Sequence, residues 1–405
     1  MTVSPDRVKA LDRLRGLSII YMLVTHMFFW FVPSESWWYY AVFPLTDFIG
    51  GCTFVFVSGA GMVLSMRKNP ESPGSLQHLR SVMLIAIGMI QNVVDPAIDY
   101  WGWTILITIG ICRLVGYFTL KYPAWVRCAL MVVCVVIARP LLLTLVGGGV
   151  FAGGFGASLW PQVLTPASFF GWFLFNLANQ NTFFPYFGFF LAGTVFVDLL
   201  LLQPKEKQAI SQRMFVFVGA LLVTVGLNLG LFFNTTLDPG DKLLWYLNTF
   251  GGKNLAEIPA ILSRNSISWS LTALGAQFLL GVLFLQYESW VFKNKTLRIY
   301  GEYSLTIYLF SYLVYCCGDG TWHMWWGLPL LAGVVILTRF IFQFWDSKWQ
   351  GKYSFEWVIT LAVKQYRQHL SNKTPMPKSA EPIPEDVEVE PTAIESSVPI
   401  LGKNT

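Results

Sequence analysis

The sequence predicts an all-α membrane protein, a bundle of about ten transmembrane helices with both termini in the cytoplasm. Three observations support this fold class. Of the 405 residues, 54% are hydrophobic and 13% are charged, whereas a soluble globular protein carries about 25% charged residues. The apolar residues form ten segments that are each near the roughly 20 residues needed to cross a bilayer. Lys and Arg gather in alternate connections between these segments, which is the charge bias of cytoplasmic loops.

The ten predicted spans must be helical, because lipid offers no hydrogen-bond partner to an unpaired backbone group. They cover residues 17–33, 43–65, 79–96, 102–120, 124–145, 183–202, 214–234, 267–287, 297–317 and 324–345. Segment 165–180 is also apolar, but Pro166 and several Asn and Gln residues make it a poor span. We expect it to be re-entrant or to lie at the interface.

The loops that we place outside the cytoplasm hold only Lys242, Lys253 and Arg264 as positive residues, and the opposite loops hold many more. This difference sets the predicted orientation. The first apolar run is too long for a cleavable signal peptide, so we expect it to act as an internal insertion signal. The predicted location is the cell membrane, with multiple passes.

We expect three parts along the chain. Residues 1–352 form the transmembrane domain. Residues 353–370 place apolar side chains at helical spacing beside Lys364 and Arg367, which predicts an amphipathic helix on the cytoplasmic surface. Residues 371–405 are rich in Pro, Glu, Ser and Thr, and such a segment has too little apolar surface to fold.

Several classes of site and partner are excluded by composition and spacing. The net charge of +5 is dispersed over short loops rather than gathered in a stripe, so no nucleic acid is expected. The six cysteines are scattered without metal-ligand spacing, so no metal is expected. No P-loop or dinucleotide fingerprint is present.

Two long connections, about 146–182 and 235–266, lie on the predicted outer face. Connections longer than about 12–15 residues are uncommon unless they are functional or disordered. They favour an acceptor site on the outer side, and the alternative is that they merely cap the bundle.

Arg15 and His26 are the first candidate site residues. They are eleven residues apart in the first span, so they share one helix face and lie about 16 Å apart along its axis. His26 is then roughly halfway through the hydrocarbon, where an ionisable residue is a candidate for function. A neutral imidazole can serve as a general base near pH 7.

Asp47 is the expected partner of His26. Both residues lie about 8–10 Å below the outer surface if their spans are regular helices, and consecutive spans with a short connection are usually neighbours. An aspartate there would orient the imidazole, as in hydrolase triads. The alternative is that Asp47 lies in the wet interface and needs no partner.

Arg13, Arg15 and Arg113 are candidates for binding a phosphate-bearing ligand from the cytosol. Guanidinium groups bind phosphate in a forked geometry, and Arg113 lies within a span, where it cannot face lipid comfortably. The alternative for Arg13 and Arg15 is that they anchor the cytoplasmic end of the first span.

Six segments form a pattern of motifs along the chain: Leu11–Gly16 followed by His26, Asp47–Gly59, Ile105–Gly110, Phe184–Gly193, Gly301–Leu309 and Phe355–Trp357. These motifs resemble the transmembrane acyltransferase superfamily, which includes the acyltransferase-3 and heparan-α-glucosaminide N-acetyltransferase families. Ser311 and Ile307 stand where some members often carry His and Asn, so the subfamily and the acceptor stay open.

The resemblance implies a membrane enzyme that takes an acyl group, most often acetyl, from cytosolic acyl-CoA. Arg13, Arg15 and Arg113 would hold the phosphates of the donor, and His26 with Asp47 would be catalytic. The acceptor would be a hydroxyl or amine of a glycan, a glycolipid or a small molecule on the outer side. Membrane lipid is a further expected partner, and a homodimer is compatible with these features.

Two rival classes stay open. A transporter or a lipid or polyprenol flippase would also hold buried charges and outer loops, although the sequence shows no pair of related halves. A non-catalytic membrane scaffold would keep the fold without the chemistry.

Overall fold

The structure is a computed structural model that describes residues 5–31, 48–68, 74–94, 104–137, 183–232, 267–287, 293–315 and 324–373. Throughout these ranges the regular structure is helical, with no strand. The chain divides into two compact units, Met1–Val363 and Lys364–Thr405. Every contact discussed below lies within the first unit.

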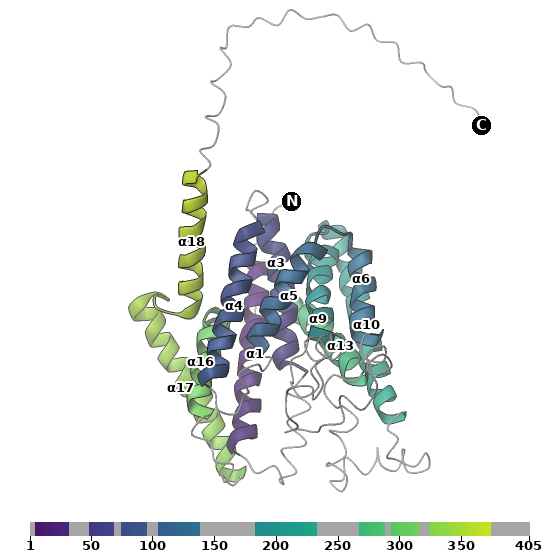
Figure 1. Ribbon diagram of the computed structural model, residues 1–405. Coiled ribbons are helices and arrows are strands. Elements are labelled where there is room, and N and C mark those ends of the chain that lie inside the picture. The colour runs from purple at the N-terminus through teal and green to yellow at the C-terminus, as the bar shows by residue number, and fades with distance from the viewer. Residues whose placement is uncertain are drawn as a thin grey trace, which may run out of the picture. The chain divides into compact units, whose positions relative to one another are not determined.

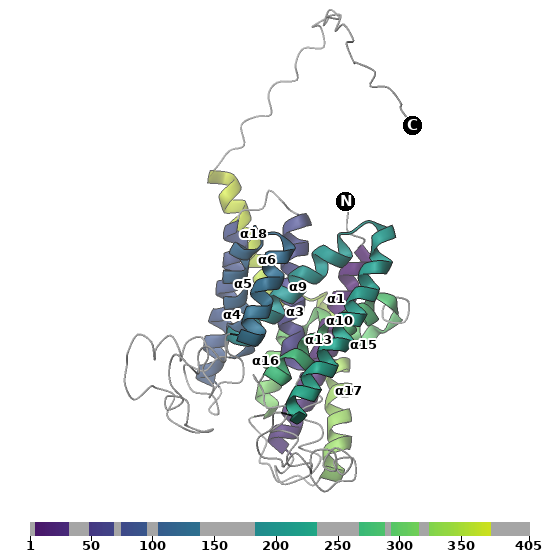
Figure 2. The ribbon, with the colours of Figure 1, turned by 90° about the vertical axis from the view of Figure 1, so that its right-hand side faces the viewer.

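Figure 1 colours the helices by residue number, and Figures 1 and 2 show from two perpendicular directions that most helices of the first unit run alongside one another. The described ranges contain twelve α-helices and two π-helical turns. They are α1 (Pro5–Phe31), α3 (Gly50–Lys68), α4 (Gly74–Val94), α5 (Ile105–Thr119), α6 (Ala124–Val132), η1 (Val133–Ile137), α9 (Phe183–Phe196), η3 (Val197–Leu201), α10 (Lys205–Phe232), α13 (Ile267–Gln286), α15 (Lys295–Glu302), α16 (Ser304–Tyr315), α17 (Met324–Trp349) and α18 (Phe355–Lys373).

Each predicted span contains a helix wherever the structure describes it. Within the described residues, five helices have the length and apolar composition to cross a membrane, and these features show an integral membrane protein built from helices. The five are Gly50–Lys68, Phe183–Leu201, Glu206–Gly230, Ile267–Gln286 and Pro329–Trp349. The total of ten spans and the cytoplasmic placement of both termini stay predictions.

The predicted span 297–317 differs from the structure, which has two helices there. Asn294 begins α15 by accepting hydrogen bonds from the backbone of Thr296 at 3.0 Å and of Leu297 at 3.1 Å. The helix ends at Tyr303, whose φ of −109° and ψ of 24° are not helical. The next helix, α16, then has free backbone N–H groups of its own to satisfy. Hydropathy alone does not detect such a break, because both sides of it are apolar.

Glycines allow the closest helix contacts. A Cβ at Gly59 of α3 would overlap the carbonyl oxygen of Phe190, and a Cβ at Gly193 of α9 would overlap that of Phe56. Small residues let backbones approach in this way in membrane helices. The stretch around Gly59, expected from sequence to pack closely, therefore sets the α3–α9 contact.

Buried polar side chains join α3 to α13. The Gln277 Nε2 donates to the carbonyl oxygen of Phe48 at 2.6 Å, and its Oε1 accepts from the hydroxyl of Thr53 at 2.7 Å. Both side-chain ends of this fully buried glutamine are thereby satisfied. The bonds fix the turn that precedes α3, which supports one wall of the cavity described next.

Candidate active site

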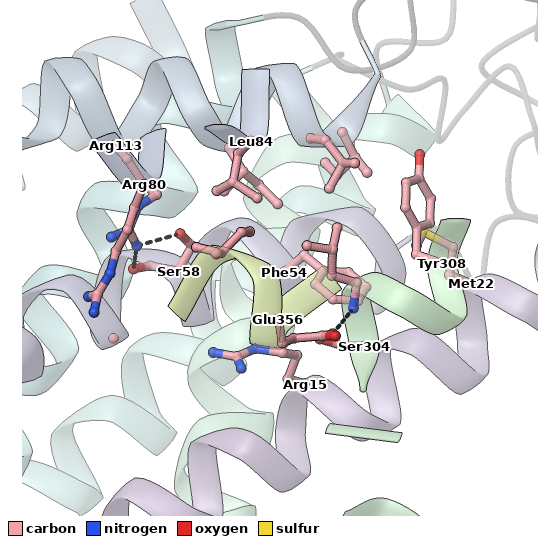
Figure 3. Close-up of a pocket in the computed structure, with 16 residues that line it drawn as sticks. Arg15, Met22, Phe54, Ser58, Arg80, Leu84, Arg113, Ser304, Tyr308 and Glu356 are labelled. Carbon is pink, nitrogen blue, oxygen red and sulfur yellow. Dashed lines mark hydrogen bonds between the residues drawn. The ribbon is translucent and has the colours of Figure 1, made fainter. Parts of the chain in front are cut away.

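A cavity of about 310 Å³ lies between α1, α3, α4, α5, α16 and the first turns of α18. Its walls are mainly apolar, with charged side chains gathered on one side, as Figure 3 shows. Small-molecule sites usually have this character of apolar walls with few polar groups. The lining residues are Arg15, Met22, Phe54, Ser58, Gly61, Arg80, Leu84, Ile105, Leu106, Ile109, Arg113, Ser304, Leu305, Tyr308, Glu356 and Ile359.

Three arginines from three helices, Arg15, Arg80 and Arg113, line one side of this cavity. The Arg113 guanidinium is held by neutral acceptors. Its Nη1 donates to the carbonyl oxygen and the hydroxyl of Ser58 at 3.4 and 3.3 Å, and its Nη2 donates to Oε1 of Gln77 at 2.9 Å. Among the described residues no carboxylate forms a salt bridge with Arg113. Its positive charge is therefore available to an anionic ligand.

Gln77 and Ser65 link Arg80 to Arg113. The Nε2 of Gln77 donates to the hydroxyl oxygen of Ser65 at 3.1 Å, and Nη1 of Arg80 donates to the same oxygen at 3.3 Å. One buried glutamine thus fixes Arg113 directly and Arg80 through a serine. Three guanidinium groups on one side of a cavity suit a phosphate-bearing ligand, because guanidinium binds phosphate in a forked geometry.

Arg13 and Arg15 take different surroundings although they are two residues apart. Arg15 lines the cavity and pairs with Asp12 at 3.3 Å. Arg13 does not line the cavity and is 6% exposed. Burial lowers the pKa of Arg13, and the nearby Glu302 and Asp12 oppose that shift. Two helical steps of about 100° turn the side chains to different faces, so α15 rather than the cavity receives Arg13.

Glu356 joins α18 to the start of α16. Its Oε1 accepts hydrogen bonds from the backbone N–H of Leu305 at 2.6 Å and of Thr306 at 3.2 Å, and its Oε2 accepts from the Thr306 hydroxyl at 2.5 Å. A carboxylate satisfies the free N–H groups of a helix start and interacts favourably with the helix dipole. Burial nevertheless raises the pKa of Glu356, while the hydrogen bonds from Thr306 and Leu305 act against that rise.

A chain of polar side chains leads from the far side of the cavity to His26. The hydroxyl of Tyr308, which lines the cavity, accepts from Nε2 of Gln91 at 3.1 Å and lies 3.1 Å from the hydroxyl of Tyr312. The Tyr312 ring meets the His26 imidazole edge-on, with ring centroids 5.8 Å apart. His26 does not line the cavity itself. Two tyrosines connect it to the cavity wall.

A family comparison shows which family the chain belongs to. The catalytic domain of heparan-alpha-glucosaminide N-acetyltransferase matches residues 7–234, more than half of the chain. The chain belongs to this family. No individual curated protein matches it. The family makes the chain an N-acetyltransferase-like membrane enzyme, and the resemblance expected from the motifs is confirmed.

The residues of this candidate site come from within the matched range and from beyond it. Arg15, His26 and Arg113 lie within residues 7–234, whereas Tyr308 and Glu356 lie beyond it. The structure brings these two parts of the chain together around one cavity.

The candidates from sequence separate into three groups. Arg15 and Arg113 meet at the cavity, Arg13 packs elsewhere, and His26 lies behind the tyrosines on the same helix as Arg15. Asp47 lies outside the described residues, so its predicted contact with His26 stays a prediction.

Sequence reasoning did not single out Arg80, Tyr308 or Glu356 as site residues. Sequence reasoning grouped Arg80 with the positive residues of the predicted cytoplasmic loops, yet it lies in α4. Tyr308 and Glu356 belong to the segments Gly301–Leu309 and Phe355–Trp357, which carry the family resemblance. Those two motifs were the sequence features that could have identified Tyr308 and Glu356, because α16 and α18 contact each other through them.

Proposed function

We propose that this protein transfers an acetyl group from cytosolic acetyl-CoA to a hydroxyl or amine of a sugar-containing acceptor on the opposite side of the membrane. The observation that carries the proposal is the cavity itself, with three arginines on one side and Tyr308 on the other. The family match supports acetyl transfer. The name of the family makes a glucosamine amine the first acceptor to test.

The donor would bind with its phosphates on Arg15, Arg80 and Arg113. Bidentate guanidinium–phosphate bonds are among the stronger hydrogen bonds in proteins. The pantetheine arm would lie along the apolar wall that includes Met22, Phe54 and Leu84. Arg15 and His26 are separated by about 16 Å along α1, which suits the extended arm. Arg13 would support this arrangement from its buried position rather than bind the phosphates.

His26 would act as the general base. It would take the proton of the attacking hydroxyl or amine, and it would later return a proton to the thiolate that leaves. Asp47, as predicted from sequence, would orient the imidazole. Both direct transfer and a transient acyl-imidazole at His26 are consistent with this placement, and both release CoA as the free thiol.

The test uses the purified full chain in lipid nanodiscs with acetyl-CoA and glucosamine, and it measures the release of free CoA thiol. We expect turnover in the wild type and its loss in His26→Ala. His78→Ala is the matched control, because His78 packs against Tyr117 and Phe118 and does not line the cavity. Turnover in His26→Ala equal to wild type would refute the catalytic role of His26. Uptake of the acceptor into sealed vesicles that carry the protein, without CoA release, would favour the transporter alternative.

A further inference from the structure

Gly61 is the only glycine among the residues that line the cavity. A Cβ at this position would meet no atom within 4 Å, so the open space beside its backbone belongs to the cavity. Packing accounts for Gly59 on the same helix, where a Cβ would overlap the Phe190 carbonyl oxygen, but it does not account for Gly61. Glycine is among the least favourable residues in a helix interior, and it serves where another group must approach the backbone closely. The bare backbone at Gly61 can therefore receive a group of a ligand.

Gly61 lies between two serines that hold arginines. Ser58 is three residues before it and Ser65 is four residues after it in α3, so all three share one face of the helix. Ser58 accepts from Arg113 through its carbonyl oxygen at 3.4 Å and its hydroxyl at 3.3 Å, and the Ser65 hydroxyl accepts from Arg80 at 3.3 Å. Figure 3 shows both arginines on the side of the cavity where Ser58 lies. The open backbone thus separates the anchor points of two guanidinium groups.

The charge around this opening suits an anion. Arg113 is held by Ser58 and Gln77, which are both neutral, and Gly61 has no side chain that would keep a ligand away from the guanidinium groups. Guanidinium binds phosphate oxygens in a forked geometry. Two such groups from two helices, α4 and α5, can bind two adjacent phosphates. A diphosphate is the part of a CoA thioester that has this charge and this extent.

We infer that Gly61 keeps open a subsite for the diphosphate of the donor, and that the protein thereby selects acyl thioesters that carry this group over those that lack it. This inference rests on the proposed function, because it needs an acyl-CoA donor in the cavity. It makes Gly61 a specificity-determining residue, whereas the arginines supply the charge.

The reacting end of the donor would lie away from this subsite. Phe54, on the apolar wall, is seven residues from Gly61 on the same helix and also lines the cavity, which separates them by about 10 Å along α3. A side chain placed at Gly61 should therefore exclude the diphosphate and leave the pantetheine arm and the thioester in place.

The variant that tests this is Gly61→Leu in the purified full chain in lipid nanodiscs, assayed with two donors. Acetyl-CoA carries the diphosphate, and S-acetylpantetheine has the same thioester without any phosphate. We expect the KM for acetyl-CoA to rise about 10- to 100-fold, the value of one or two charged hydrogen bonds. The kcat at saturating acetyl-CoA and the kcat/KM for S-acetylpantetheine should stay within about twofold of wild type, because the substitution removes uniform binding of one part of the donor.

Gly333→Leu is the matched control. Gly333 is an exposed glycine of α17, a Cβ there would also have no atom within 4 Å, and it does not line the cavity. It adds the same side chain to a membrane helix, and neither donor should change. Wild type should prefer acetyl-CoA to S-acetylpantetheine, Gly333→Leu should keep that preference, and Gly61→Leu should lose most of it.

Two results would overturn the subsite. Equal losses with both donors in Gly61→Leu would show that the side chain disturbs the reacting end or the fold, and an unchanged KM for acetyl-CoA would show that no part of the donor occupies this space. If Gly61→Leu does not fold, Gly61→Ala decides by the same ratio of the two donors, with a smaller change expected because it adds one methyl group.

Binding of CoA itself separates this inference from the proposed function. Titration calorimetry measures CoA binding without acyl transfer. Wild type that binds CoA, loses that binding in Gly61→Leu and releases no thiol from acetyl-CoA would overturn acetyl transfer and leave the subsite standing. Thiol release by wild type, with equal CoA affinity in wild type and Gly61→Leu, would overturn the subsite and leave acetyl transfer standing. Absence of both CoA binding and thiol release in wild type would overturn both.

Discussion

Glu356 and Thr306 cap each other's helices across 50 residues of sequence. The Glu356 carboxylate accepts from the backbone N–H and the hydroxyl of Thr306 at the start of α16, and the Thr306 hydroxyl accepts from the backbone N–H of Phe355 at the start of α18, at 2.9 Å. Thr306 lies two residues before Tyr308. The first turn of α18 is thereby locked to the helix that carries the inner wall of the cavity.

The first prediction concerns the dependence of stability on pH. Burial raises the pKa of Glu356 above its ordinary value of 4.5, so the folded chain binds this proton more tightly than the unfolded chain. Stability from this group is then complete below the ordinary value and declines as pH rises through the raised value. We expect Glu356→Gln to reduce the loss of stability with rising pH. Melting temperatures in detergent between pH 4 and pH 8 measure that loss.

Glu356→Ala serves as its companion, because it removes the cap altogether. It should lower stability at every pH in that range by about 0.5–2 kcal/mol, the usual cost of losing a helix N-cap. A pH slope in Glu356→Gln identical to wild type would show that another group is responsible.

A second prediction concerns Arg113. Its guanidinium contacts only neutral acceptors among the described residues, Ser58 and Gln77, so an anionic donor would provide its missing counter-charge. Arg113→Met should weaken acetyl-CoA binding about 10- to 100-fold, the value of one or two charged hydrogen bonds. Titration calorimetry measures the effect.

The matched control for Arg113→Met is Arg67→Met. Arg67 is 67% exposed, lies at the end of α3 and has Asp198 as its ionic neighbour, so acetyl-CoA binding should not change. Equal weakening by the two substitutions would indicate a general effect of protein charge and would remove Arg113 from the phosphate site.

A third prediction separates the two arginines of the first motif. Arg15 lines the cavity and Arg13 is buried beside Glu302. Arg15→Ala should weaken acetyl-CoA binding more than acceptor binding, with little change in melting temperature. Arg13→Ala should lower the melting temperature with little change in acetyl-CoA binding, since Arg13 is buried and its charge interacts with Glu302 and Asp12. Similar effects of the two variants on acetyl-CoA affinity would contradict this division.

The sequence predicts the positions of the helices better than it predicts the residues of the candidate site. Apolar runs located the helices well, because length and hydropathy are local properties. The break between α15 and α16 escaped that reasoning, since the carboxylate that caps α16 there belongs to Glu356, 53 positions beyond Tyr303. A cap supplied from so far along the chain leaves no local pattern in the sequence.

Sequence reasoning about the candidate site is strongest within a single helix. The eleven-residue spacing of Arg15 and His26 follows from helix geometry, and both residues lie in α1. Spacing alone did not show that Arg15 lines the cavity and Arg13 does not. That difference depends on α15, which packs against the face of α1 that carries Arg13. Tyr308 was not singled out for a similar reason. A tyrosine in an apolar run meets Gln91 and the cavity only through tertiary packing.

The last prediction tests the packing that shapes the cavity wall. A Cβ at Gly59 would overlap the Phe190 carbonyl, whereas one at Gly61, two residues along the same helix, would have no atom within 4 Å. Gly59→Ala should therefore lower the free energy of unfolding by about 1–3 kcal/mol or more, as overpacked sites do. Gly61→Ala should be neutral or stabilising by up to about 1 kcal/mol, the helix preference of Ala over Gly. Melting temperatures in one detergent compare the two. Equal values would mean that α3 and α9 do not approach as closely as their glycines allow.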